Sequence, residues 1–187
     1  MLYLIHKLKS YSGRPSELLN SFTMTSLATA FLSSPVGLLE LRGSEAGLSA
    51  VLFREEGHAA VTPDRDLPTC LREVARQLQA YFGRELRDFQ LTYDLLQGTD
   101  FQRRVWAALP GIGYGHTASY LDVAKLLGNP AAVRAVGAAN GQNPLAIVLP
   151  CHRVVGANGQ LTGYAGGLAR KRWLLDLENP PIQGQLF

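Results

Sequence analysis

Residues 143–155 read Asn-Pro-Leu-Ala-Ile-Val-Leu-Pro-Cys-His-Arg-Val-Val. The apolar run at 145–149 is short, rich in branched side chains and followed by Pro150, which predicts a buried strand or extended segment. The run leads to a thiol, an imidazole and a guanidinium, those of Cys151, His152 and Arg153. A thiolate is the reactive form of cysteine, and a neighbouring base or positive charge favours it. Because adjacent strand residues point to opposite faces, Cys151 and His152 can cooperate only if the chain turns there or a water bridges them.

An isolated Cys-His pair is more often a buried structural cysteine beside a histidine whose hydrogen bonds are satisfied, so the surrounding sequence has to decide. That sequence contains further short motifs, which are FQRRVW at 101–106, TASY at 117–120, RAVG at 134–137, NP at 143–144, PCHRV at 150–154, TGYAGGL at 162–168, KRWLL at 171–175 and Glu178. In this order the motifs closely resemble the active-site region of the O6-alkylguanine-DNA alkyltransferases, also called methylated-DNA–protein-cysteine methyltransferases.

Length and composition agree with a small soluble protein. The chain has 187 residues, enough for one domain or two small ones, and two cysteines, Cys70 and Cys151. Two cysteines do not make a disulfide framework, and no Cys-x-x-Cys pair is present, so we expect free thiols in a reducing cytoplasmic setting. No apolar run approaches transmembrane length and residues 1–5 are too short for a signal core, so we expect no membrane partner.

The charge is unevenly divided between the two halves of the chain. Residues 1–100 carry 10 Lys and Arg against 12 Asp and Glu, a balance of 10 − 12 = −2, whereas residues 101–187 carry 8 against 3, a balance of 8 − 3 = +5. A basic half that contains the reactive cysteine suits a polyanionic partner such as DNA, although ordinary fluctuation in charge would also produce it.

The first half has the pattern of a small α+β domain at residues 27–98, preceded by a disordered extension at 1–26. We expect strands at 36–42, 48–54 and 59–62, a helix at 67–82 that Gly83 ends, and a strand or extended connection at 91–95. No catalytic group stands out here, so the domain's expected role is support.

Cys70 near the start of the predicted helix is interpreted as structural or surface. Some members of the alkyltransferase family hold a structural zinc in this domain. The spacing of His6, His58 and Cys70 does not reproduce a recognisable ligand set, so we predict neither metal nor cofactor.

The second half, residues 99–187, is expected to be mostly helical and to contain a helix-turn-helix. Thr99 with Gln102 matches a capping box at the start of one helix. Thr117 or Ser119 can cap the next helix, which runs through residue 127 and ends at Gly128. Residues 129–130 are Asn-Pro, a capping side chain followed by Pro at the first helical position, so a further helix is expected at 130–140.

That last helix has two different faces when it is wound at 3.6 residues per turn. Val133, Val136 and Gly137 share the side expected to meet the core. The opposite side carries Ala131, Arg134, Ala135 and Ala138. It is too bare to read bases in the major groove, but it is smooth enough to press against a narrow groove while Arg134 projects alone. A plain Ala-rich surface helix would look the same. In the family this helix enters the minor groove, and the matching Arg fills the place of the base that has left the stack.

The resemblance also implies roles for residues outside this helix. Cys151 would accept the alkyl group, His152 would be its base through a bridging water, and Glu178 would orient His152. Tyr120 would donate to the departing guanine, and Asn143 would tie the active-site segment to the preceding turn. The remaining implied positions are the DNA contacts Thr117 and Ser119, and the base pocket of Pro150, Val154, Tyr164, Ala165, Gly166 and Gly167.

The residues themselves leave simpler interpretations open. Glu178 could form a surface pair with Lys171 or Arg172, Tyr120 could be a core aromatic, and Asn143 could be an ordinary turn residue before Pro144. One independent feature favours a partner for Glu178: it lies in the last turn of a helix expected at residues 168–178, where the helix dipole disfavours an acid.

Together these features predict a two-domain α+β DNA-repair protein that extrudes O6-alkylguanine from double-stranded DNA and transfers the alkyl group irreversibly to Cys151. A monomer is expected, and clustering of molecules along DNA is left open. Two alternatives remain. One is a non-catalytic module that binds altered guanine, a class in which the reactive cysteine is replaced. The other is a helix-turn-helix regulator with a structural cysteine, against which the bare Ala face argues.

Overall fold

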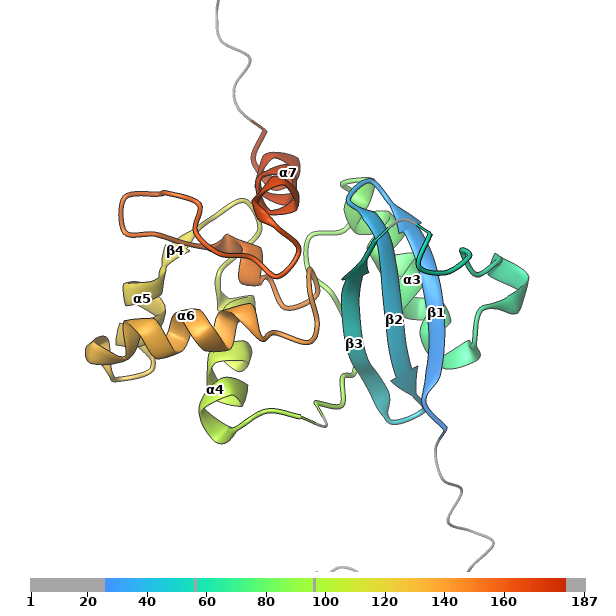
Figure 1. Ribbon diagram of the computed structural model, residues 1–187, viewed down its shortest axis with the longest axis horizontal. Helices are drawn as coiled ribbons and strands as arrows, with labels where there is room; N and C mark the ends of the chain where they lie inside the picture. Colours follow the sequence, from blue (N-terminus) through green and yellow to red (C-terminus); the bar gives the residue numbers. More distant parts are fainter. Residues whose placement is uncertain (1–25, 56, 96, 181–187) are drawn as a thin grey trace, which may run out of the picture.

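The computed structural model describes residues 26–55, 57–95 and 97–180. Figure 1 shows a small antiparallel sheet backed by one long helix, beside a group of shorter helices, so the chain has the predicted mixed α+β architecture. The disordered extension predicted at residues 1–26 lies outside the described residues, except for Ser26. No helix of the described part is long and apolar enough to cross a membrane.

The sheet has three strands in the order of the sequence: β1 (Ala28–Ser34), β2 (Gly37–Ser44) and β3 (Gly47–Arg54). Strands β2 and β3 confirm the expectation from the sequence. Strand β1 was missed, because its Thr and Ser residues obscure an alternation in which only Ala30 and Leu32 are buried. In β2 the inward Leu39 and Leu41 alternate with Glu40, whose carboxylate pairs with Arg42 and Arg54 on the other face.

The strand predicted at residues 59–62 is wrong. The segment is irregular, and Thr62 attaches it to β1 by two hydrogen bonds. The Thr62 amide donates to the Phe31 carbonyl at 2.8 Å, and the Phe31 amide donates to Thr62 Oγ1 at 2.9 Å. Because the hydroxyl takes the place of a backbone partner, the pairing does not continue into a fourth strand.

Helix α3 (Thr69–Phe82) follows a short 3₁₀ turn, η1 (Asp64–Asp66), and packs against the sheet. Its buried stripe includes Leu71, Val74, Leu78 and Tyr81, the spacing that predicted the helix. The expected extended connection at 91–95 is confirmed, because Leu48 of β3 donates to the Thr92 carbonyl and accepts from the Asp94 amide.

The helical half begins with α4 (Asp100–Ala108), where Thr99 and Gln102 form the predicted capping box. A 3₁₀ turn, η2 (Leu109–Gly111), leads to β4 (Ala118–Ser119). Ser119, one of the two candidates, then caps α5 (Tyr120–Leu126). Gly128 has a φ of 75°, which ends the helix as expected.

The helix predicted at 130–140 is divided into a 3₁₀ turn, η3 (Pro130–Ala132), and α6 (Val133–Gly141). The capping role predicted for Asn129 is wrong, because its side chain makes no cap hydrogen bond. Trp106 of α4 holds α6 in place by donating its indole N–H to the Ala139 carbonyl at 2.8 Å.

The apolar run at 145–149 is buried, but the strand predicted there is wrong. The run folds into a tight turn in which the Leu149 amide donates to the Leu145 carbonyl at 2.9 Å, and only Leu145 pairs with a strand, at Val51 of β3. Beyond the turn come η4 (Cys151–Arg153) and β5 (Val154–Val155), which runs parallel to β4, and then α7 (Leu168–Glu178).

Candidate active site

Asn143 shapes the turn that delivers Cys151. Its side-chain amide donates to the Leu145 and Leu149 carbonyls at 3.3 and 2.7 Å, while its carbonyl oxygen accepts from the Leu145 amide at 3.0 Å. Ile147, inside the turn, has a φ of 72°, a conformation that a β-branched residue rarely adopts. Asn143 therefore does more than begin a turn: it supplies the partners that keep a strained, dry loop in one shape.

The chain also turns at the cysteine itself, which satisfies one of the two conditions for Cys151 and His152 to cooperate. Both residues lie in η4 and both are buried. Burial raises the pKa of the Cys151 thiol, while Asn143, Lys171 and Tyr164 act in the opposite direction. Before a substrate binds, the thiol is therefore protonated and shielded from solvent.

Glu178 is the centre of a buried hydrogen-bond network. Its Oε1 accepts from His152 Nε2 at 2.9 Å and from Arg153 Nη2 at 2.9 Å, and its Oε2 accepts from Arg153 Nε at 2.9 Å. The Gly115 amide donates to Oε2 at 3.2 Å and the Tyr81 hydroxyl to Oε1 at 2.8 Å. The surface pairing of Glu178 with Lys171 or Arg172 is excluded, because the carboxylate faces inward.

The network fixes the charge of Glu178 and the tautomer of His152. Burial opposes ionisation of Glu178, yet hydrogen bonds from His152 and Arg153, together with the charge of Arg153, lower its pKa to about 2. Burial lowers the pKa of His152, and the charges of Arg153 and Lys171 act in the same direction, so that together they outweigh the opposing effect of Glu178. An ionised carboxylate can only accept, so Nε2 of the neutral His152 carries the proton. Nδ1 is buried and has no hydrogen-bond partner among the residues that the structure describes, which leaves its lone pair free.

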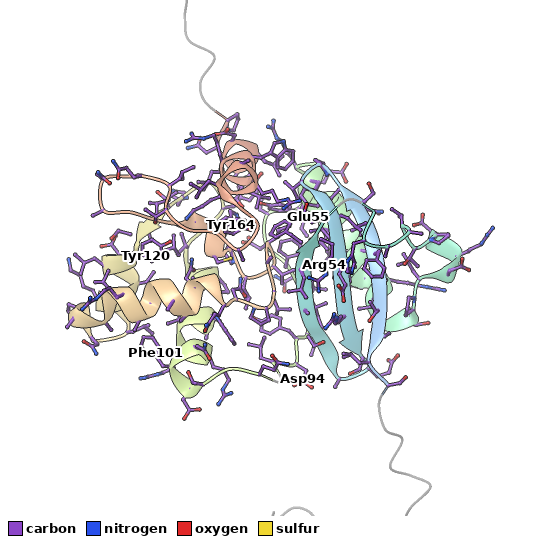
Figure 2. The ribbon with its side chains drawn as sticks, viewed as in Figure 1. Arg54, Glu55, Asp94, Phe101, Tyr120 and Tyr164 are labelled. Carbon is purple, nitrogen blue, oxygen red and sulfur yellow. The ribbon has the colours of Figure 1, made fainter. Side chains whose placement is uncertain are left out.

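A hollow of about 440 Å³ opens beside α6 and contains several of the predicted residues. Tyr120, Arg134, Tyr164 and Ala165 line it, together with Val133, Gly137, Gly141, Thr162 and Gly163. Figure 2 labels Tyr120 at the start of α5 and Tyr164 on the loop before α7, both on the same side of α6. The Thr162 hydroxyl donates to the Tyr120 hydroxyl at 3.4 Å, which closes one edge of the hollow.

Tyr164 connects this hollow to the cysteine. Its hydroxyl is buried without a hydrogen bond of good geometry, and its pKa is raised by burial and by the neighbouring Cys151. The tyrosine therefore forms both a wall of the hollow and part of the environment of the sulfur.

The other predicted pocket residues lie around the hollow without lining it. Pro150 and Val154 are buried on either side of η4. Gly166 packs against the ring of Phe53 from β3 so closely that an added Cβ would lie 2.6 Å from it. Gly167 has a φ of 84° where the loop enters α7. These two glycines allow the loop to lie between β3 and the hollow.

The exposed face of the helix-turn-helix is as predicted. Ala131, Arg134, Ala135 and Ala138 are exposed, whereas Val136 is buried. Ser119 is occupied with capping α5, and Thr117 lies in a different hollow, between the loop at 111–118 and α5.

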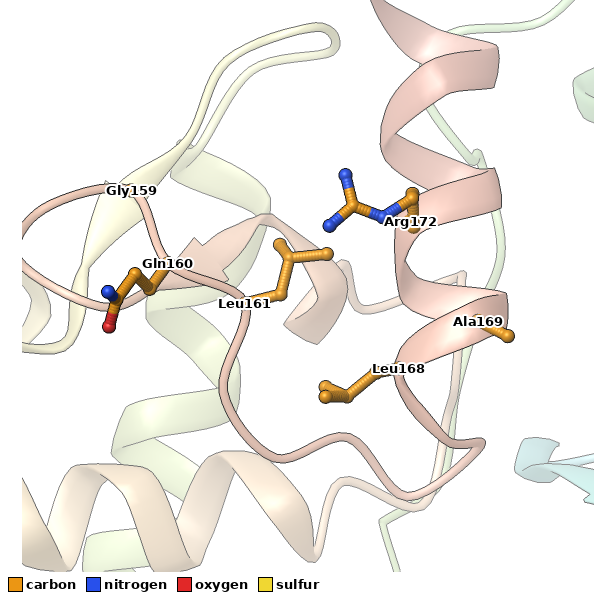
Figure 3. A pocket seen from close by; sticks show the side chains of 6 residues that line it. All are labelled: Gly159, Gln160, Leu161, Leu168, Ala169 and Arg172. Atoms are coloured by element: carbon orange, nitrogen blue, oxygen red, sulfur yellow. The ribbon is translucent and has the colours of Figure 1, made fainter.

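Figure 3 shows a third hollow, of about 510 Å³, between the loop at 159–161 and the start of α7. Leu161, Leu168 and Arg172 contribute its larger side chains. It contains no residue predicted for the reaction. Within the described part of the chain, no group of three or more His, Cys, Asp and Glu side chains is placed to hold a metal ion.

Comparison with known proteins agrees with this geometry. Residues 27–95 match the family model of the 6-O-methylguanine DNA methyltransferase ribonuclease-like domain, and residues 100–180 match the model of its DNA-binding domain. A methylated-DNA–protein-cysteine methyltransferase of Methanosarcina acetivorans is 49% identical over 151 residues, covering 80% of this chain and 96% of the relative. The crystal structure of Mycobacterium tuberculosis O6-methylguanine methyltransferase superposes with a TM-score of 0.73 at 45% identity, covering 86% of this chain and 98% of that one.

The chain belongs to the methylated-DNA–protein-cysteine methyltransferases. A structure of the Mycobacterium tuberculosis relative in complex with DNA has a TM-score of 0.71 at 48% identity, covering 80% of this chain and 91% of that one.

Arg153, Lys171 and Tyr81 are among the residues of this methyltransferase that were not assigned a role from the sequence, although they lie in the network or close to the cysteine. Arg153 makes the principal ion pair with Glu178, and its position directly after Cys-His was the available signal. Lys171 is fully buried, donates to the Val154 and Thr162 carbonyls at 2.6 and 2.9 Å, and places its charge near Cys151. Its spacing of three and seven residues from Leu174 and Glu178 puts it on the same helix face. Tyr81 was indistinguishable from a core aromatic.

Replacing Asn143 with Ala should destabilise the methyltransferase by about 3 kcal/mol, because three hydrogen bonds are lost and buried carbonyls are left without donors. Urea unfolding of the variant measures this effect. Asn158→Ala, at an exposed turn, is the matched control and should change stability by less than about 0.5 kcal/mol. Equal effects of the two substitutions would contradict the role given to Asn143.

The pKa of Glu178 predicts a pH-dependent contribution to stability. Its folded-state pKa of about 2 lies below the usual 4.5, so the contribution is complete above pH 4.5 and is lost as the pH falls toward 2. The difference in free energy of unfolding between the native chain and Glu178→Gln should therefore shrink by roughly half or more between pH 5 and pH 3. Denaturant titrations at several pH values test this, with Glu45→Gln on the exposed β2–β3 turn as control. A difference that does not vary with pH would contradict an ionised Glu178.

Proposed function

We propose that this chain repairs DNA by moving the alkyl group of O6-alkylguanine to Sγ of Cys151, once per molecule. The observation that carries the proposal is the buried series of Glu178, His152 and Cys151, in which His152 is neutral and its Nδ1 is free. Membership of the methylated-DNA–protein-cysteine methyltransferases supports the reaction class, which is methyl transfer from O6-methylguanine in DNA to a protein cysteine.

DNA engages the helix-turn-helix in this proposal. The Ala face of α6 enters the minor groove, and Arg134 occupies the space that the target base leaves in the stack. The base must leave because its O6 alkyl group cannot meet a buried thiol while the base remains paired. The net charge of +5 on residues 101–187 favours the approach to phosphates. The structure of the Mycobacterium tuberculosis relative with DNA supports DNA as the partner.

The extruded base occupies the hollow beside α6. Tyr120 and Tyr164 stand at its walls, and Gly137, Gly141 and Gly163 leave room for a flat ring. Tyr164 lines the hollow and neighbours Cys151, so in this proposal the alkyl carbon reaches the sulfur from the side of the hollow.

The chemical step begins when Nδ1 of His152 takes the thiol proton through a bridging water. Glu178 stabilises the imidazolium that forms, and the ammonium of Lys171 stabilises the thiolate. Sulfur then attacks the alkyl carbon, a C–S bond forms, the C–O6 bond breaks, and its electron pair stays on guanine. Tyr120 donates a hydrogen bond to the guanine as negative charge develops on it.

The product explains why the reaction occurs once. A thioether is a poor leaving group, and Cys70, the other cysteine, lies in α3 and not in the network. We propose that a monomer carries out the reaction.

Intact-mass measurement after mixing with duplex DNA containing O6-methylguanine tests the reaction directly. The native chain should gain one methyl group, and peptide mapping should place it on Cys151. Cys70→Ser should gain the same mass, whereas Cys151→Ala should gain none. Methylation of Cys70, or repair by Cys151→Ala, would overturn the proposal.

The extrusion step is tested with Arg134→Ala. We expect transfer from duplex DNA to slow by about tenfold or more, because the gap in the stack is no longer filled, while transfer from the free base O6-methylguanine stays within about twofold of the native rate. Arg65→Ala, at a highly exposed site in η1 outside the helix-turn-helix, is the control and should leave both rates unchanged. An equal loss on both substrates would contradict a role for Arg134 in extrusion.

A further inference from the structure

We propose that Tyr81, a residue of the N-terminal sheet domain, is a positioning residue for alkyl transfer, because its hydroxyl holds the oxygen of Glu178 that also receives His152. This inference rests on the proposed function and extends the working site beyond the residues around the cysteine. The Tyr81 hydroxyl donates to Glu178 Oε1 at 2.8 Å, and the imidazole Nε2 donates to the same oxygen at 2.9 Å.

The environment of Tyr81 explains why this contact is well defined. The side chain has no exposed surface, and its ring packs against those of Phe82, Phe89 and Tyr114 at centroid distances of 5.5, 5.4 and 6.2 Å. Burial and the nearby charge of Glu178 raise the pKa of the Tyr81 hydroxyl, so the hydroxyl keeps its proton and remains a donor throughout the working pH range. A fixed donor on a rigid helix limits where the carboxylate can lie.

The shared oxygen gives Tyr81 an electrostatic effect on His152. A carboxylate oxygen that already accepts a hydrogen bond from a phenol is a weaker acceptor for the imidazole. Without the phenol, Glu178 attracts a proton on His152 more strongly, and the basic neutral form of His152 is lost at a higher pH. The titratable and charged groups that face this pair are Tyr81 of α3, Tyr114 of the loop before β4, Arg153 of η4 and Lys171 of α7.

A purely structural role makes a different prediction. If Tyr81 only filled space, Tyr81→Phe would leave the pH dependence unchanged, because the ring remains. Tyr114→Phe provides the matched control. Its hydroxyl also belongs to a partly buried aromatic cluster, but it donates to the Leu177 backbone carbonyl at 3.4 Å and not to the carboxylate.

The experiment measures the single-turnover rate of methyl transfer from O6-methylguanine duplex DNA between pH 4.5 and 9, using the full chain. In Tyr81→Phe the acid side of the profile should move up by about one pH unit, so the rate falls about tenfold at a pH well below the native midpoint and by less than about twofold at pH 8. Tyr114→Phe should retain the native profile. An unchanged profile in Tyr81→Phe, or the same shift in both variants, overturns the inference.

A second variant covers the case in which Tyr81→Phe does not fold. Site-specific 3-fluorotyrosine at position 81 keeps the hydroxyl and makes it a stronger donor, so the acid side of the profile should move to lower pH. A shift to higher pH, or none, overturns the inference. Failure of the proposed function is seen separately, because the native chain itself would then show no methyl transfer to Cys151.

Discussion

The structure depends on one carboxylate placed where water does not reach it. An ionised Glu178 in the interior requires compensation, and Arg153 supplies it through hydrogen bonds to both carboxylate oxygens. Once that pair is formed, burial and the nearby charges of Arg153 and Lys171 oppose a proton on His152, so His152 stays neutral and points its Nε2 proton at Glu178. The free lone pair of Nδ1 follows from this arrangement. The basic nitrogen of His152 is thus a consequence of the ion pair between Arg153 and Glu178.

The same interior also shields the thiol of Cys151 from solvent. Burial keeps Cys151 protonated and away from solvent, although Lys171, Asn143 and Tyr164 are placed to favour its ionised form. We therefore expect the thiol of Cys151 to ionise in the complex with DNA and not before. If the reaction is the proposed single-turnover transfer, such protection is valuable, because adventitious alkylation or oxidation would waste the molecule.

Much of the fold could be predicted from local patterns, and the failures share a cause. The apolar stripe of α3, the capping box of α4 and Gly128 all act within a few residues, so the sequence displays them. The run at 145–149 was taken for a strand because a short buried apolar segment looks the same in either conformation. Asn143 decides between them, and its hydrogen bonds to carbonyls up to six residues away leave no periodic trace.

In the candidate site, too, local features could be predicted from the sequence and long-range contacts could not. Cys151, His152 and Glu178 were found because a family resemblance marks them, and the exposed face of α6 followed from helical spacing. Tyr81 could not be found, since it lies 97 residues from Glu178 and occupies a position that any core aromatic would fill. The sheet domain is also more than a support: Val51 pairs with the turn before the cysteine, and Phe53 packs against the loop at Gly166.

Nitrogen-15 NMR of histidine-labelled protein examines the protonation state of His152 most directly. From pH 6 to pH 8 the His152 ring should give the signals of a neutral imidazole, with the proton on Nε2 and a bare Nδ1. A His152→Asn sample assigns those signals. An imidazolium at neutral pH, or a neutral ring protonated on Nδ1, would contradict the account, because Nδ1 would then have no lone pair with which to take the proton from Cys151.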